Sequence, residues 1–121
     1  MPILEITTNV KVNDEKAFTS ALAKEGINVL GMDKYWTVMY KYNEGLIFAG
    51  THEPAFYMTI LTVLGLPTSN NADYSKKFFA FLEAELGVPH DRGYIVFNDP
   101  GPDRLGFQST TFDILLKQMG K

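Results

Sequence analysis

Apolar side chains recur at helical spacing in two segments of the chain, residues 15–30 and 73–86. This spacing places them along one face of a helix. An Asn-Asp pair (13–14) precedes the first segment and offers good N-caps. A glycine follows each segment directly (Gly31 and Gly87), as at many helix ends. We therefore expect two helices, each with one buried face. The apolar positions are Phe18, Ala21, Leu22, Val29 and Leu30 in the first, and Tyr74, Phe78, Phe81, Leu82 and Leu86 in the second.

Other segments are rich in β-branched, aromatic and alternating residues, which is typical of strands. The expected strands are residues 3–10, 36–42, 55–63 and 94–97. Segments 46–50 and 105–107 follow turn-forming residues, so we expect them as short return strands that pair back.

The order strand, helix, strand, return strand occurs twice, about 50–55 residues apart, which indicates an internal duplication. Each helix is expected to be a right-handed crossover between parallel strands. The predicted fold class is α+β. It has two pseudo-repeated β-α-β units, a four-stranded mixed sheet and two helices on one face. We expect a single domain over residues 1–121, with 113–121 as a C-terminal extension.

Three of the expected strands (36–42, 55–63 and 94–97) are apolar on both alternating sides. Strands of this kind are buried on both faces, yet the helices cover only one. The sequence therefore favours a homo-oligomer whose sheets face its centre. The alternative is a monomer in which the C-terminal segment 110–121 provides partial cover.

Composition narrows the function classes. With 45% hydrophobic and 21% charged residues, the chain of 121 residues is expected to fold. A net charge of −3 without a basic run argues against nucleic acid and membrane surfaces as partners. The absence of cysteine excludes disulfides and thiol chemistry. The chain shows neither a classical signal peptide nor a membrane-spanning apolar run. We expect a cytoplasmic protein, with non-classical secretion as the alternative.

Most familiar catalytic motifs are missing. His52 and His90 lie far apart without cysteine companions, so no metal site is expected. The segment LGLPTSNN lacks the lysine of a P-loop, and no nucleophile-elbow pattern occurs. We expect no cofactor.

Pro2 is the unusual candidate. Removal of Met1 would leave a secondary amine, and an α-amino group has a reference pKa of about 7.7–8.0. Burial in an apolar cleft lowers this pKa, so the amine could act as a general base near neutral pH. The alternative is a proline that only begins a strand.

Five segments, in order, resemble the macrophage migration inhibitory factor and D-dopachrome tautomerase family from Pro2 to about Phe112. They are MPILEITTNV, VLG, FAGTHEP, DYSKKFFAFLEAELGVPHDRGYIVF and LGFQSTTF. The resemblance implies the tautomerase (MIF-like) fold and a homotrimer with its sheets around the centre. It also implies a keto–enol tautomerase, an isomerase, with a pocket at each subunit boundary for small aromatic keto or enol compounds of phenylpyruvate or dopachrome type.

The resemblance also assigns roles within that pocket. Pro2 matches the catalytic base, and Tyr94 matches an aromatic rim residue supplied by a neighbouring subunit. The other matched pocket positions are Tyr35, Leu64, Phe107 and Phe112. The individual aromatic residues have packing as their alternative role.

Two departures bear on substrate binding. Met32 stands where the family usually has a lysine for the substrate carboxylate, and Lys34 either reaches the same space or is solvated. Val96 replaces an asparagine, which removes a donor. The alternative function is therefore a cytokine-type binding protein with weak or no tautomerase activity and a protein receptor. The residues after Phe112 exceed the usual length, and Ile114, Leu115 and Leu116 are expected to pack across a subunit boundary or to cover the pocket in part.

Overall fold

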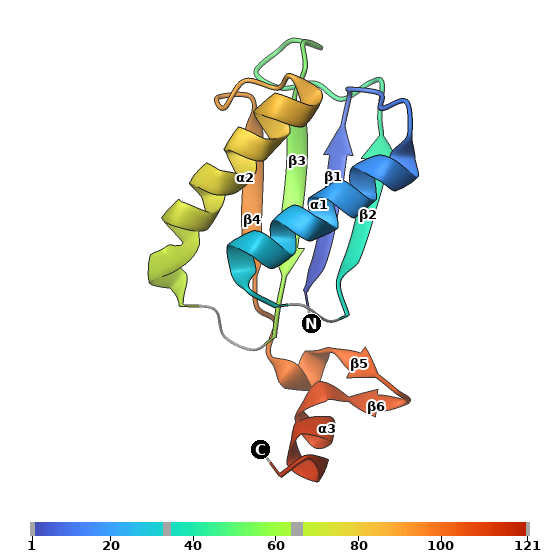
Figure 1. Cartoon of the computed structure of the whole chain (residues 1–121), viewed down its shortest axis with the longest axis vertical. Coiled ribbons are helices and arrows are strands. Elements are labelled where there is room, and N and C mark those ends of the chain that lie inside the picture. The colour runs from blue at the N-terminus through green and yellow to red at the C-terminus, as the bar shows by residue number, and fades with distance from the viewer. Residues whose placement is uncertain (1, 33–34, 64–66, 121) are drawn as a thin grey trace.

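A four-stranded mixed sheet, in the order β2-β1-β3-β4, forms the body of the protein. The computed structural model describes residues 2–32, 35–63 and 67–120. Helices α1 (Glu15–Leu30) and α2 (Asn71–Leu86) lie side by side across one face of the sheet (Figure 1). The strands are β1 (Ile3–Thr8), β2 (Thr37–Tyr42), β3 (Phe56–Leu61) and β4 (Gly93–Asn98). The predicted α+β fold class is confirmed.

The two halves of the sheet repeat the same unit. β1 pairs in parallel with β2 and β3 in parallel with β4, while β1 and β3 pair antiparallel at the centre. Each helix therefore connects two parallel strands, as the duplicated pattern predicts. The second helix begins two residues before the expected Asp73, because a 3-10 turn, η1 (Thr68–Asn70), leads directly into it.

The start of α1 and the C-terminal ends of both helices are as their sequences predict. The Asp14 carboxylate accepts a hydrogen bond from the Ala17 N–H at 3.0 Å and caps the start of α1. Gly31 and Gly87 adopt left-handed conformations with φ of 73° and 71°. Only glycine adopts this conformation without a Cβ penalty, so each glycine terminates its helix.

The core lies between the sheet and the helices. Alternate residues of the two central strands point toward the helices, and each fully buried Leu, Ile, Phe or Met side chain contributes about 1.5–3 kcal/mol. Thr8 is buried among them, and its hydroxyl donates to the Ala55 carbonyl at 2.7 Å. The central residues of this core are Leu4, Ile6, Leu22, Phe56, Met58, Ile60, Phe78 and Leu82.

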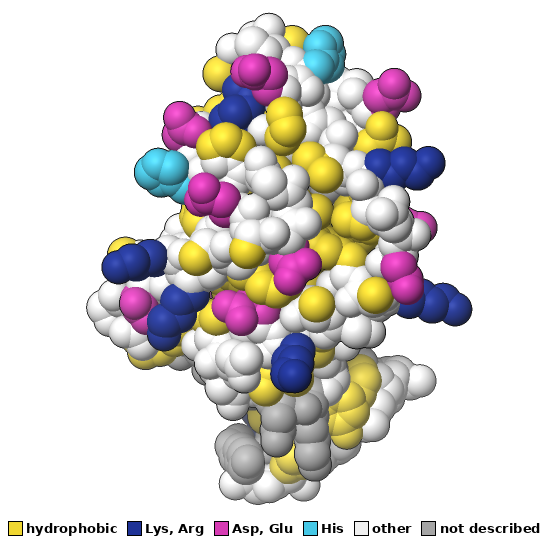
Figure 2. Space-filling model, turned by 45° about the horizontal axis from the view of Figure 1, so that its top comes forward, with side chains coloured by type: hydrophobic (Ala, Val, Ile, Leu, Met, Phe, Trp, Pro, Cys, Tyr) yellow, Lys and Arg dark blue, Asp and Glu magenta, His cyan; other side chains and the backbone are white. Residues whose placement is uncertain are grey.

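The other face of the sheet is uncovered by the described elements of this chain. Met39, Tyr57, Tyr94 and Val96 are partly exposed, with Tyr94 at 67%. The strands are thus apolar on both sides, as predicted, while the helices bury only one side. Figure 2 shows acidic and basic side chains interspersed over one face of the molecule, without an extended basic patch on that face.

Both expected return strands differ from the prediction. Segment 46–50 does not pair back with β2. Instead, Phe48 and Thr51 exchange backbone hydrogen bonds of 3.0 and 3.1 Å, because Ala49 and Gly50 have φ of 50° and 83° and close a tight turn. The segment around 105–107 contributes β5 (Gly106–Phe107), which pairs with β6 (Thr110–Thr111) in a separate two-stranded sheet.

The end of the chain forms a distinct feature, here called the C-terminal unit (residues 101–120). It contains η2 (Pro102–Arg104), the β5–β6 hairpin and helix α3 (Phe112–Gln118). It lies beyond the end of the main sheet at which β1 begins (Figure 1). The C-terminal unit therefore stands next to the Pro2 end of the sheet.

Candidate active site

Pro2 is buried at the beginning of β1, with less than 2% of its surface exposed. Its carbonyl accepts a hydrogen bond from the Thr37 N–H at 3.1 Å, which extends the pairing of β1 and β2 to this residue. The proline is therefore held by the sheet at the end that faces the C-terminal unit (Figure 1).

Three predicted pocket residues, Tyr35, Phe107 and Phe112, come together beside this end of the sheet. The ring centroids of Tyr35 and Phe107 are 5.7 Å apart, and those of Phe107 and Phe112 are 6.4 Å apart. They line a cavity of about 180 Å³, here called the aromatic cavity. Its lining consists of Tyr35, Phe107, Gln108, Phe112, Leu115, Leu116 and Met119.

The β5–β6 hairpin fixes one wall of the aromatic cavity. Gln108 and Ser109 occupy the two turn positions with φ of 54° and 65°. Such values are typical of the tight turns that join twisted antiparallel strands. The N–H of Phe112 donates to the Leu105 carbonyl at 2.9 Å and anchors the start of α3 to the residue that precedes β5.

A hydrogen bond between two side chains stabilises the first turn of α3. The Thr111 hydroxyl donates a hydrogen bond to the Asp113 carboxylate. This bond, supported by backbone N–H groups and Lys117, lowers the pKa of Asp113 below its ordinary value of 3.8. A carboxylate in the first turn also interacts favourably with the helix dipole.

The segment before β2 is positioned by Trp36. Its indole N–H donates to the Met32 carbonyl, and its ring packs against Gly26 of α1. A Cβ at Gly26 would lie only 2.5 Å from the ring, so glycine is what permits this close approach. Met32 is half-buried in this segment. The predicted site residues Lys34 and Leu64 lie outside the described residues.

Tyr94 and Val96 do not meet the aromatic cavity within one chain. They lie on β4, at the opposite edge of the sheet from β2, and their side chains are on the uncovered face. The prediction that Tyr94 serves a neighbouring subunit's pocket is compatible with this placement and stays a prediction.

Sequence analysis did not identify Arg92, whose side chain binds the loop beside Tyr94. Its guanidinium donates to the carbonyls of Phe48, Glu53 and Pro54 at 3.2, 3.1 and 2.9 Å. It also lies 5.3 Å from the centre of the Phe48 ring, which in turn contacts Tyr94 with a centroid distance of 5.4 Å. Arg92 thus supports Tyr94 through the loop and the Phe48 ring.

Gln108 and Met119 are cavity residues that sequence reasoning missed. For Met119 a signal was present, because Phe112, Leu115, Leu116 and Met119 follow helical spacing and share one face of α3. Gln108 had no comparable signal, since its place in the lining depends on the turn geometry.

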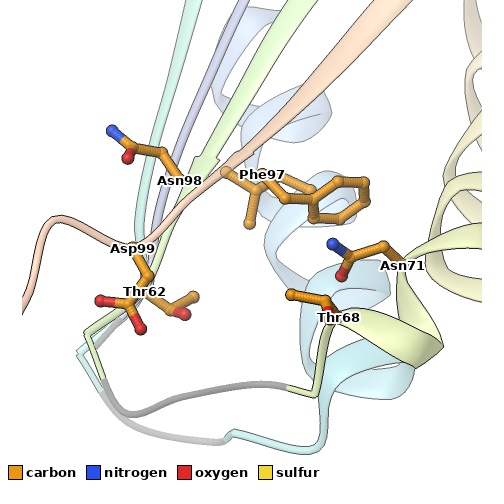
Figure 3. A pocket seen from close by; sticks show the side chains of 7 residues that line it. Thr62, Thr68, Asn71, Phe97, Asn98 and Asp99 are labelled. Atoms are coloured by element: carbon orange, nitrogen blue, oxygen red, sulfur yellow. The ribbon is translucent and has the colours of Figure 1, made fainter.

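A second cavity, of about 120 Å³, lies between the ends of β3 and β4 and the start of α2 (Figure 3). Thr62 and Asp99 approach it from the sheet, and Thr68 and Asn71 from the helix side (Figure 3). The Asp99 carboxylate accepts a hydrogen bond from the Gly101 N–H at 3.0 Å, which ties it to a turn. None of the described candidate residues lines this cavity, so we place the candidate site at Pro2 and the aromatic cavity.

The described part of the chain holds no cluster of three or more potential metal ligands among its His, Asp and Glu residues. The two histidine side chains lie well apart (Figure 2). Within the same described ranges, every helix is too short or too polar to cross a membrane.

Comparison with known proteins places these features in a family. The sequence model described as "Macrophage migration inhibitory factor (MIF)" matches residues 1–113. A macrophage migration inhibitory factor homolog from Trichinella spiralis is 34% identical over 114 residues, which cover 93% of this chain and 100% of that protein. The mouse macrophage migration inhibitory factor is 25% identical over 114 residues, covering 93% of this chain and 99% of that protein.

Solved structures agree with the sequence comparison. The structure of the Trichinella spiralis macrophage migration inhibitory factor superposes with a TM-score of 0.83 at 33% identity, covering 91% of this chain and 99% of that chain. A homologue from Prochlorococcus marinus gives a TM-score of 0.82 at 27% identity, with 91% and 98% coverage. The chain therefore belongs to the macrophage migration inhibitory factor family.

Proposed function

We propose that this protein is a keto–enol tautomerase for small aromatic substrates, and that Pro2 acts as its general base after removal of Met1. The carrying observation is the burial of Pro2 at the end of the sheet beyond which the C-terminal unit lies, while the aromatic cavity is lined by residues of that unit and by Tyr35. Membership of a family that includes tautomerases supports the same activity.

The chemistry requires only one proton to move and return. The neutral ring nitrogen of Pro2 takes a proton from the carbon beside the substrate carbonyl. The electrons of the broken C–H bond form the C=C bond of the enol, and the carbonyl oxygen receives the negative charge. The protonated Pro2 nitrogen then gives the proton to that oxygen. Substrate and product are isomers, so the step consumes neither an oxidant nor a reductant.

The surroundings of Pro2 favour this role. A buried amine loses solvation of its charged form, which lowers its pKa toward the range of a general base. The rings of Tyr35, Phe107 and Phe112 offer an apolar wall to the aromatic part of a substrate. Pairing of Pro2 with Thr37 holds the nitrogen in a constant position relative to the sheet.

The proposal includes a homotrimer. The uncovered face of the sheet carries Met39, Tyr57, Tyr94 and Val96, which a trimer would remove from water. It would also bring Tyr94 toward the pocket of a neighbouring subunit. Sedimentation of the processed protein should give three times the chain mass of 13.6 kDa. A monomer at micromolar concentration would contradict the trimer.

Intact mass spectrometry followed by a phenylpyruvate assay tests the role of Pro2. The purified protein should lack Met1, and Pro2→Gly should reduce enolisation by about 100-fold or more, the scale of general-base catalysis. Pro89→Gly is the matched control, because Pro89 is exposed and outside the cavity. Normal turnover by Pro2→Gly, or by a chain that keeps Met1, would exclude Pro2 as the base.

Met32 and Val96 favour a second candidate function. In the family these two positions usually hold a lysine that binds the substrate carboxylate and an asparagine that supplies a hydrogen-bond donor. The pocket proposed here lacks both polar contacts. On this alternative the protein is a cytokine-type binding protein that recognises a protein receptor. A wild-type protein that is processed and trimeric but inactive on phenylpyruvate would support this second function.

For either function, we propose that the protein resides in the cytoplasm, with secretion by a non-classical route as the alternative.

A further inference from the structure

Two polar side chains hold the loop of residues 46–54, which lies between β2 and β3. Asn9, directly after β1, donates to the carbonyl of Leu46 at one end of the loop and to that of Glu53 at the other, at 3.3 and 2.9 Å. Its amide oxygen accepts a hydrogen bond from the Ala55 N–H at 2.9 Å. Asn9 therefore holds the two ends of the loop, and the turn between them depends on other contacts.

Arg92 anchors that turn. Its guanidinium donates to the carbonyls of Phe48 and Thr51, the two residues that close the turn, at 3.2 and 3.5 Å. Between them, Ala49 has a positive φ of 50°, and such a conformation persists where surrounding contacts enforce it. The backbone of Arg92 is itself fixed, because its carbonyl accepts a hydrogen bond from the Phe56 N–H at 3.1 Å. Arg92 thus ties the turn to the start of β3.

The ring of Phe48 connects this anchor to Tyr94. The Arg92 guanidinium lies 5.3 Å from the centre of the Phe48 ring, within the range of a cation–π contact. The Phe48 and Tyr94 rings pair at a centroid distance of 5.4 Å and an interplanar angle of 41°. Among the described rings, Phe48 is the one paired with Tyr94, which is otherwise 67% exposed. Loss of Arg92 should therefore release the Phe48 ring and, with it, the Tyr94 ring.

We propose that Arg92 is a positioning residue. It holds the Tyr94 ring through Phe48, and Tyr94 then contacts the aromatic part of a substrate in the pocket of a neighbouring subunit. The part that concerns the substrate rests on the proposed function, whereas the coupling of Arg92 to Tyr94 does not. Because Arg92 acts on a wall of the pocket and not on Pro2, it governs substrate affinity and leaves proton transfer unchanged.

Steady-state kinetics of the processed protein with phenylpyruvate test this role. Arg92→Gln should raise KM about fivefold, within the scale of one lost aromatic pair, and should leave kcat unchanged. A rise in KM at constant kcat indicates a lost binding contact. Lys76→Gln is the matched control, because it also removes one positive charge and Lys76 is exposed on α2. A fall in kcat at constant KM would contradict the positioning role.

Two further variants separate the coupling from general damage to the loop. Phe48→Leu removes the ring but keeps the carbonyl that Arg92 binds, so it should raise KM as much as Arg92→Gln does. In a Tyr94→Ala background, Arg92→Gln should cause no further rise in KM, because its effect passes through Tyr94. An unchanged KM in Phe48→Leu, or effects that multiply in the double variant, would overturn the proposal. If Arg92→Gln does not fold, Arg92→Lys replaces it, since lysine keeps the charge but lacks the planar fork that spans several carbonyls.

NMR of the aromatic side chains separates this inference from the proposed function. Arg92→Gln should shift the Tyr94 ring signals in the same direction as Phe48→Leu, since both take the Phe48 ring away from Tyr94. Lys76→Gln should leave these signals in place. An inactive wild type with these shifts would refute the tautomerase and keep the coupling. Turnover that depends on Pro2, with the Tyr94 signals and KM unchanged in Arg92→Gln, would overturn the coupling and keep the tautomerase.

Discussion

The β-α-β body and the C-terminal unit are built on different principles. Every buried hydrophobic residue among those described lies between Pro2 and Val88, within the body. The C-terminal unit contains no buried residue, and its elements pack chiefly against one another. The body therefore stabilises itself, while the C-terminal unit is a lightly anchored attachment whose shape can change at small cost to the fold.

Truncation of one large side chain in each region should show this difference most strongly. Phe78 of α2 is fully buried, so Phe78→Ala should lower the free energy of unfolding by about 3–5 kcal/mol. Phe107→Ala should cost about 1 kcal/mol or less, because the ring is only half-buried. Urea unfolding followed by far-ultraviolet circular dichroism measures both values. Equal losses would mean that the C-terminal unit is part of the main cooperative core.

Gly26 bears on the contact between the two regions through Trp36, which packs against it and precedes β2 next to Tyr35, whose ring contacts Phe107. Gly26→Ala gains about 1 kcal/mol of helix propensity in α1. However, its Cβ would lie 2.5 Å from the Trp36 ring, and overpacking of this kind costs about 1–3 kcal/mol. We expect net destabilisation and a displacement of the Tyr35 side of the aromatic cavity.

Gly45→Ala is the matched control for Gly26→Ala, because a Cβ there meets only an Asn43 oxygen at 3.5 Å. Thermal unfolding should place this variant close to the wild type. If Gly26→Ala proved more stable than the wild type, the Trp36 ring would have another position available, and its role at the junction would be refuted.

The body could be predicted well from the sequence because its signals are local and repeated. Helix α1 was expected at 15–30 and is found at Glu15–Leu30, since periodicity, an Asp14 cap and Gly31 all agree. Arg92 escaped prediction because its partners are backbone carbonyls about forty positions away, which leave no side-chain pattern.

The C-terminal unit was predicted less well. Segment 105–107 was expected as a short strand that returns after the preceding turn, but the positive φ values at Gln108 and Ser109 make it one arm of a local hairpin with β6. No Asn-Gly or similar pair announces that turn. Phe107 and Phe112 were predicted pocket residues and do share a cavity with Tyr35, whereas the contribution of Gln108 follows only from the turn geometry.

Protonation of Asp113 should produce the smallest effect, confined to the C-terminal unit. The Thr111 hydroxyl bond holds the pKa of this carboxyl below 3.8 in the folded protein. A lowered folded pKa means that the charged form adds stability above the unfolded value, and that this stability disappears as the pH falls through the folded value. NMR amide signals of α3 should therefore lose dispersion as the pH drops below about 3.8, before or without unfolding of the body.

Asp113→Asn should show weakened α3 signals already at neutral pH and no further change in that acid range. Simultaneous loss of body and α3 signals in both proteins would show that the two regions unfold as one unit, and the contrast between them would fail.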